Sequence, residues 1–124
     1  MGNQVKKRSR SKSAPHIAAI SFLLNIFPGT TIHEEVTIPG SDKLYLDIFL
    51  PSIPLVVEVH GEQHYQHIPF FHKTKGEFLI SQKRDRDKER WARMNKFHFV
   101  ALPHNKEEEW LTLINLAISP DSTT

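Results

Sequence analysis

The chain has 124 residues, of which 39% are hydrophobic and 24% are charged, and this composition predicts one globular domain rather than an intrinsically disordered chain. It contains no cysteine, which excludes a disulfide framework and a thiolate zinc site and leads us to expect a cytoplasmic location. The formal net charge of +2 combines a strongly basic N-terminus with a body in which acidic residues outnumber basic ones.

The first twelve residues are expected to form a flexible basic arm. They contain no acidic residue and five basic ones, Lys6, Lys7, Arg8, Arg10 and Lys12, which leaves 11 basic residues against 14 acidic ones in the rest of the chain. A basic arm on an acidic body suits a segment that follows the phosphates of a nucleic acid and releases counterions. A solubilising tail is an equal alternative, and a targeting signal is a weaker one.

Residues 13–119 are expected to form one domain, and residues 120–124 a disordered tail. The domain should open with a helix from about residue 14, because Ser13 can cap it and Pro15 is tolerated in a first turn. Apolar residues at helical spacing continue as far as Phe27, before a Pro-Gly pair. This stretch is much shorter than the ~20 apolar residues of a membrane span and lacks a small-residue cleavage site. We therefore expect no membrane partner and no signal peptide.

Three strands are expected next, over residues 32–38, 44–50 and about 55–61. The first alternates apolar and polar residues and places Glu35 on its polar face. The other two are separated by a short turn with two prolines, residues 51–54, and this arrangement predicts a hairpin.

The hairpin should bring two carboxylates together. Alternation places four apolar residues on one face of the 44–50 strand and Asp47 on the other; the four are Leu44, Leu46, Ile48 and Leu50. Symmetry about the turn pairs residues whose numbers sum to about 105, so Asp47 should lie opposite Glu58. Opposed carboxylates repel each other, and a shared proton or a divalent cation would offset the repulsion. A solvated sheet face is the alternative.

A cation at this position would suit phosphodiester chemistry. Mg²⁺ can activate water and stabilise the charge that develops on a phosphate. His60, on the same face as Glu58, or His64 could transfer the proton, although either histidine taken singly could be structural. A zinc site built from His60, His64, His67 and His72 is a weaker alternative, because their spacing is irregular.

A loop with a weak helical start is expected over residues 66–81, and a highly charged helix over residues 82–95, with Trp91 and Met94 as its apolar anchors. Basic residues alternate there with acidic ones, which predicts an ion-paired, solvated face for most of them. Asp85 and Lys88 are candidates for a further role.

A strand over residues 96–102 should end at Pro103. Asn105, with Glu108 three residues later, resembles a capping box that opens a last helix.

Three ordered motifs within residues 44–104 carry a family resemblance. They read Leu-Asp-Ile-Phe-Leu-Pro at 46–51, Val-Val-Glu-Val-His-Gly-Glu-Gln-His-Tyr at 56–65, and Arg-Asp-Arg-Asp-Lys at 84–88 continuing to Ala-Leu-Pro at 101–103. Together they resemble the PD-(D/E)xK nuclease superfamily, in its branch near the very short patch repair endonucleases and the phage EDxHD homing endonucleases.

The resemblance implies an α/β fold with a restriction-endonuclease-like core, in which a mixed β-sheet centred on a hairpin has flanking helices. It also implies an Mg²⁺- or Mn²⁺-dependent endonuclease that nicks or cuts DNA and that is similar to phage-encoded enzymes. The sequence does not fix the oligomeric state, and a homodimer is compatible with it.

The resemblance further implies roles for residues of the hairpin and the segment after it. Asp47 and Glu58 look like the metal-binding acids, and the carbonyl of Val59 looks like an additional ligand. His64 resembles the family's catalytic histidine, with Gln63 beside it.

On the charged helix, Asp85 and Lys88 match positions that complete or support the active centre, and Arg84 is a candidate contact to nucleic acid.

Two positions depart from the family pattern. His60 stands where the superfamily usually has lysine and where this branch often has aspartate, although some repair endonucleases have Thr-His-Gly there. His16 occupies the place of a first-helix glutamate, for which Glu35 is a candidate substitute. These departures support a rival hypothesis, a catalytically inactive nuclease-fold protein that binds nucleic acid or a host protein.

Overall fold

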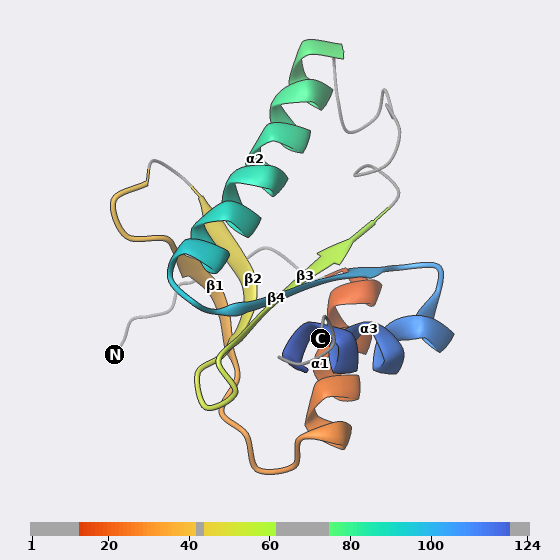
Figure 1. Cartoon of the computed structure of the whole chain (residues 1–124). Helices are drawn as coiled ribbons and strands as arrows, with labels where there is room; N and C mark the ends of the chain where they lie inside the picture. The colour runs from red at the N-terminus through yellow and green to blue at the C-terminus, as the bar shows by residue number, and fades with distance from the viewer. Residues whose placement is uncertain (1–12, 42–43, 62–74, 120–124) are drawn as a thin grey trace, which may run out of the picture.

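The computed structural model describes residues 13–41, 44–61 and 75–119. They form an α/β fold in which a four-stranded mixed sheet packs against three α-helices (Figure 1). The predicted basic arm and the predicted C-terminal tail lie outside the described residues.

The sheet has the strand order β1-β2-β3-β4. The strands β1 (His33–Thr37), β2 (Tyr45–Leu50) and β3 (Leu55–His60) pair in antiparallel fashion, and β4 (His98–Pro103) pairs with β3 in parallel. Parallel neighbours need a crossover connection, and here it contains α2 (Lys75–Met94). The prediction of a mixed sheet centred on a hairpin is therefore confirmed.

The first helix, α1 (Ala14–Ile26), begins as the sequence predicts. The hydroxyl of Ser13 accepts a hydrogen bond from the backbone N–H of His16 at 3.2 Å, and Pro15 lies in the first turn. The chain then turns at Gly29, whose φ of 81° is readily adopted only by glycine.

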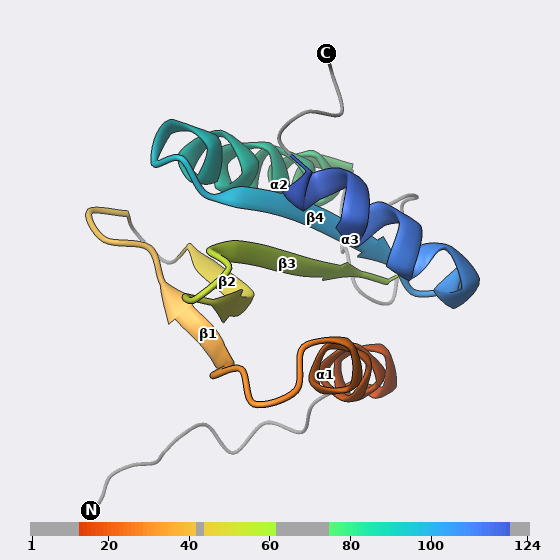
Figure 2. The ribbon, with the colours of Figure 1, turned by 60° about the horizontal axis from the view of Figure 1, so that its bottom comes forward.

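Helices cover both faces of the sheet, as expected. On one face, α1 and α3 (Trp110–Ile118) share a core, in which the rings of Phe22 and Trp110 lie 5.6 Å apart, centroid to centroid. On the other face, Ala92 of α2 packs against Val56. Figure 2 accordingly places α1 and α2 on opposite sides of the strands. Burial on both faces explains why four of the six residues of β3 are apolar.

Helix α2 differs from its prediction in two ways. It begins at Lys75 rather than at residue 82, and its N-terminal half extends beyond the sheet (Figure 1), where Leu79 and Ile80 are exposed and create no amphipathic pattern. The prediction that Met94 anchors the helix is wrong, because this side chain is 75% exposed and the buried residue is Ala92. None of the helices in the described part of the chain has both the length and the apolarity that crossing a bilayer requires.

The predicted capping box before the last helix is also wrong. A 3-10 turn, η2 (Glu107–Glu109), precedes α3, and Lys106 at its N-terminus makes no side-chain capping hydrogen bond. The helix instead begins at Trp110, which is fully buried and donates a hydrogen bond from its indole nitrogen to the carbonyl of Pro103 at 2.8 Å. Burial of one large side chain thus fixes the helix start.

The prediction that Leu46 shares a face of β2 with Ile48 and Leu50 is wrong as well. Ile48 and Leu50 pack in the core on the side of α1 and α3, whereas Leu46 packs with Val56 on the side of α2. The alternation of β2 therefore breaks between Leu46 and Ile48, which is the position of Asp47.

Candidate functional site

The hairpin has the register that the short turn predicts. Ile48 pairs with Val57, and each residue pair in this ladder sums to 105. In the same register, Asp47 and Glu58 are the next pair, at the end of the hairpin that lies away from the turn.

Side chains replace the backbone ladder at this pair. One carboxylate oxygen of Glu58, Oε2, accepts a hydrogen bond from the backbone N–H of Asp47 at 2.8 Å. In return, Oδ2 of Asp47 accepts one from the backbone N–H of Val59 at 3.0 Å. The two carboxylates therefore meet between β2 and β3, and each is held by the backbone of the other strand.

The neighbouring pair of strands is distorted at the same level. The register of β1 with β2 pairs Glu34 with Ile48 and Val36 with Leu46, which leaves Glu35 opposite Asp47. Glu35 has a φ of 53°, in the left-handed region that carries a penalty of roughly 1–2 kcal/mol for residues other than glycine. Backbone strain of this kind clusters at functional sites. Asp47 therefore lies at the centre of a local break that spans three strands.

Glu58 is almost completely removed from solvent, with 1% of its surface exposed. This burial, together with repulsion from Asp47, raises the pKa of Glu58 to about 7, although Lys88 and the backbone N–H of Asp47 act in the opposite direction. A buried carboxyl group under these influences is easily shifted between its charged and neutral forms by a nearby positive charge.

Lys88 of α2 provides such a charge. Its Nζ lies 3.0 Å from Oε1 of Glu58, and only 14% of its side chain is exposed. The structure thus brings together three of the predicted site residues, Asp47, Glu58 and Lys88. Asp85, one turn earlier on α2, is half-buried, and Arg84 is exposed on the same helix.

Strand alternation directs the carbonyl of Val59 toward β2, the strand that carries Asp47. The carbonyl of His60 accepts a hydrogen bond from the N–H of His104, next to β4, at 2.9 Å. Because successive peptide groups of a strand point to opposite neighbours, the peptide groups of Val59 point to β2, as its hydrogen bond to Asp47 requires. The role of this carbonyl as a metal ligand stays a prediction.

These donors fit a hard cation that retains water ligands. In the described part of the chain, the hydrogen bond that Asp47 accepts uses Oδ2, which leaves Oδ1 for a ligand. No group of three or more His, Asp or Glu residues suited to a metal ion occurs among residues 13–41, 44–61 and 75–119. Mg²⁺ commonly binds through one or two carboxylates and several waters, and two carboxylates of this kind could serve as its protein ligands.

The structure places the two described histidines of the prediction, His60 and His16, in different surroundings. His60 ends β3 in a half-buried position, two residues after Glu58, and its Nε2 atom is buried. His16 is buried, and its Nε2 lies 2.9 Å from Oε1 of Glu34. A histidine on an apolar helix was the only signal in the sequence for this link. The role of Glu35 as a substitute for the first-helix glutamate stays a prediction.

Other predicted residues lie outside the described part of the chain. They are Gln63 and His64 of the site, His67 and His72 of the alternative zinc site, and the basic residues Lys6, Lys7, Arg8, Arg10 and Lys12 of the arm.

Comparison with known proteins gives two viral relatives. The chain is 36% identical over 69 residues to "Uncharacterized protein 307L" of Invertebrate iridescent virus 6, and these residues are 56% of this chain and 35% of that protein. It is also 36% identical over 63 residues to "Uncharacterized protein 033L" of Invertebrate iridescent virus 3, which covers 51% of this chain and 32% of that protein. The chain thus spans about a third of the length of these relatives. No protein-family model and no solved structure matches the chain.

Proposed function

We propose that this protein is a metal-dependent DNA endonuclease with a restriction-endonuclease-like core. The observation that carries the proposal is the meeting of Asp47 and Glu58 at the distorted end of the hairpin, with Lys88 at 3.0 Å from Glu58. The resemblance to PD-(D/E)xK nucleases implies an active site that contains two acidic residues and a lysine. In this chain α2 supplies the lysine, and His60 occupies the usual lysine position on the strand.

Asp47, Glu58 and the carbonyl of Val59 would hold Mg²⁺ or Mn²⁺. When bound, such a cation polarises water and neutralises the charge that develops on a phosphate during hydrolysis. Asp47 contributes a half-buried carboxylate whose orientation is fixed by Val59, and Glu58 contributes a buried one whose orientation is fixed by Asp47. Preorganised ligands of this kind need little rearrangement when the cation and substrate arrive.

Lys88 stabilises the ionised form of Glu58 and has further N–H donors that could bind the substrate. An ammonium group has three hydrogen-bond donors, and Glu58 uses one of them. The others can donate to an oxygen of the scissile phosphate or to the attacking water. His60 or His64 would carry the proton, since an imidazole titrates near neutral pH.

The proposal is tested with purified protein and supercoiled, linear and branched DNA, each with and without Mg²⁺. We expect Mg²⁺-dependent nicks or breaks with the wild-type protein, and none with Asp47→Ala or Glu58→Gln. A matched control is Asp87→Asn, which removes an acidic side chain that pairs with Lys83 on the surface of α2. Cleavage by Asp47→Ala at the wild-type rate would show that the site is assigned wrongly.

A catalytically inactive nuclease-fold protein that binds nucleic acid is the second candidate, and one observation favours it. Both oxygens of Glu58 already have partners, Lys88 and the backbone N–H of Asp47, so the buried charge is balanced without a metal. Such a protein would bind DNA but would neither bind Mn²⁺ nor cleave in its presence.

A further inference from the structure

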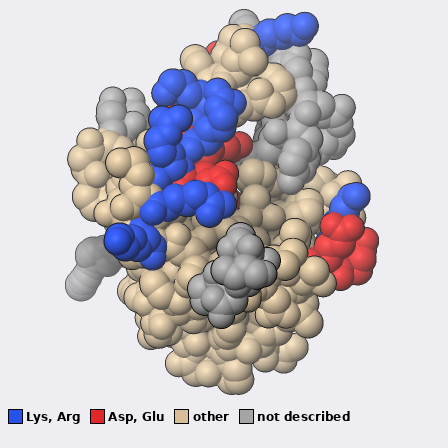
Figure 3. Space-filling view, in the orientation of Figure 1, with Lys and Arg blue, Asp and Glu red and all other residues tan. Residues whose placement is uncertain are grey.

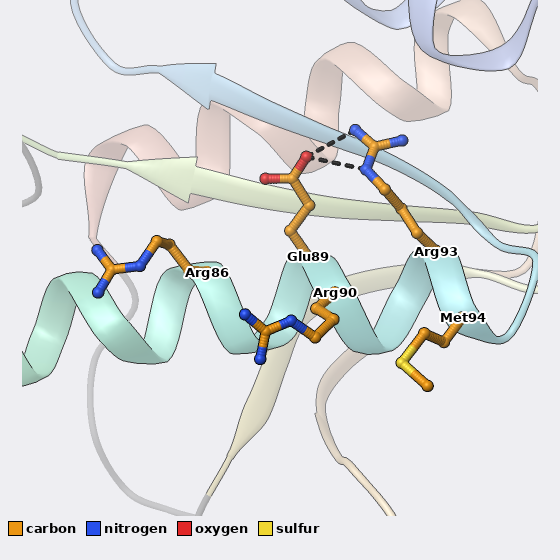
Figure 4. A pocket seen from close by; sticks show the side chains of 5 residues that line it. All are labelled: Arg86, Glu89, Arg90, Arg93 and Met94. Carbon is orange, nitrogen blue, oxygen red and sulfur yellow. Dashed lines mark hydrogen bonds and ion pairs between the residues drawn. The ribbon is translucent and has the colours of Figure 1, made fainter.

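Helix α2 carries a row of arginines on the side opposite Lys88. Arg86, Arg90 and Arg93 follow one another at intervals of four and three residues, which places them on one face of the helix. With Glu89 and Met94 they line a surface hollow of about 450 Å³ (Figure 4). Lys88 points away from this row, toward Glu58. The hollow is therefore separate from the site at Asp47.

The hollow carries excess positive charge, with three arginines and one glutamate in its lining. The side chains of Arg90 and Arg93 are 70% and 61% exposed. Arg93 is held by Glu89 through two hydrogen bonds of 2.6 and 3.0 Å. Arg86 makes no ion pair of 4 Å or less within the part of the chain that the structure describes, although its charge helps to lower the pKa of the neighbouring Asp87.

Arg90 is only loosely paired. Its guanidinium group lies 3.7 Å from Asp87, whose other oxygen is bound by Lys83 at 2.8 Å. Figure 4 shows the guanidinium groups of Arg86 and Arg90 extended in the same direction, toward the N-terminal end of α2. Lys and Arg side chains gather along this helix in Figure 3. Two guanidinium groups are thus available to an anionic ligand.

The spacing of the row fits a polyanion better than a single small anion. At a rise of ~1.5 Å per residue, the three arginines span roughly 10 Å along the helix axis. Successive phosphates of a DNA strand advance ~3.4 Å along the duplex axis, so four consecutive phosphates, separated by three such steps, cover a similar length. The planar guanidinium group also matches phosphate oxygens in a two-point hydrogen bond.

We propose that the row formed by Arg86, Arg90 and Arg93 binds the phosphate backbone of DNA that flanks the cleavage position. The row forms a second contact, on the face of α2 turned away from Glu58. The proposal rests on the proposed function for the identity of the polymer, whereas the binding itself requires no catalysis. Because phosphate contacts carry no sequence information, this surface adds affinity without sequence preference.

The test compares two double variants with the same change of charge. Arg86→Gln/Arg90→Gln removes the two available guanidinium groups, and Lys75→Gln/Lys106→Gln removes two exposed charges at other places on the surface. Binding of a labelled DNA duplex is measured by fluorescence anisotropy in EDTA, over a series of salt concentrations. Circular dichroism confirms that both variants are folded.

We expect the plot of log affinity against log salt to lose about 1.8 units of slope in the arginine variant, at about 0.9 for each lost phosphate contact. The lysine variant should keep the wild-type slope. Equal slopes for the two double variants, or no salt-dependent binding by the wild type, would overturn the proposal.

The same variants separate this inference from the proposed function. If the protein cleaves DNA with Mg²⁺ but the arginine variant keeps the wild-type slope, the arginine row does not bind DNA and the proposed nuclease activity is unaffected. If the slope falls in a protein that never cleaves DNA, the arginine row binds DNA and the proposed nuclease activity is wrong.

Discussion

Lys88 of α2 and Glu58 of β3 form a buried ion pair between two layers of the fold, with 3.0 Å between Nζ and Oε1. The pair connects the charged helix to the point where the hairpin ladder breaks at Asp47. One contact therefore contributes both to the stability of the domain and to the proposed chemistry.

Replacing Lys88 by methionine should destabilise the protein strongly at pH 8. The substitution leaves Glu58 buried beside Asp47 without a positive partner, and breaking a buried pair in this way destabilises proteins by about 3–5 kcal/mol. At pH 5 the loss should be much smaller, because Glu58 can then be protonated. The measurement is the free energy of unfolding in urea at both pH values, in EDTA.

Two comparisons make this prediction specific. The double variant Lys88→Met/Glu58→Gln should recover most of the lost stability at pH 8, since the unpaired charge is gone. Lys83→Met, which breaks the exposed pair with Asp87, should have little effect at either pH. An equal loss for Lys88→Met at pH 5 and pH 8 would mean that the ion pair is not the cause.

The stability of the metal-free protein should depend on pH through Glu58. Burial and repulsion from Asp47 raise the pKa of Glu58 from 4.5 to about 7, so the folded state binds this proton more tightly than the unfolded state. The stability that comes from the protonated form is therefore fully present below about pH 4.5 and is lost as the pH rises through about 7, by an amount on the order of 3 kcal/mol. Urea unfolding of the wild type and of Glu58→Gln across this range measures the difference. Parallel curves for the two proteins would contradict the assignment.

Asp47→Asn should separate stability from activity. The amide oxygen can still accept the hydrogen bond from Val59, while the repulsion with Glu58 disappears. We expect the variant to be as stable as the wild type or more stable at pH 8 in EDTA, by up to ~1 kcal/mol, with cleavage abolished. A variant that loses both its fold and its activity would indicate a structural role for Asp47.

The position of the two acids could be predicted from the sequence because a short turn leaves few registers for a hairpin. Each pair of the ladder sums to 105, so Asp47 and Glu58 had to be neighbours across the strands. The contact of Lys88 with Glu58 could not be derived from spacing, since the two residues lie 30 positions apart. Only the family resemblance singled out this lysine among the basic residues of α2.

The departures from prediction have local causes. Strict alternation failed at Leu46 because hydrogen bonds from side chains replace the ladder at Asp47, and a repeating pattern does not anticipate such a break. The start of α2 was missed because its first two turns extend past the sheet and carry exposed apolar residues such as Leu79. The hydrogen bond between His16 and Glu34 was missed because no spacing pattern links two residues that lie 18 positions apart on a helix and a strand.

A prediction independent of function concerns the end of α2. Lys96 is the second residue after the end of the helix at Met94; it has a φ of 64°, and its N–H donates to the carbonyl of Arg93 at 3.1 Å. Glycine is favoured at such a position, so Lys96→Gly should stabilise the protein by about 0.5–1 kcal/mol. Lys96→Ala, which keeps the unfavourable conformation, should give no gain. Thermal unfolding followed by circular dichroism decides between these outcomes, and a loss of stability in the glycine variant would argue against this helix end.

Calorimetric titration of Mn²⁺ into the wild-type protein, Asp47→Asn and Glu58→Gln tests most directly whether the two acids hold a cation together. We expect one bound ion per wild-type chain and no measurable binding to either variant, with both variants folded. Binding of Mn²⁺ to Asp47→Asn as tight as to the wild type, or no binding to the wild type, would contradict it.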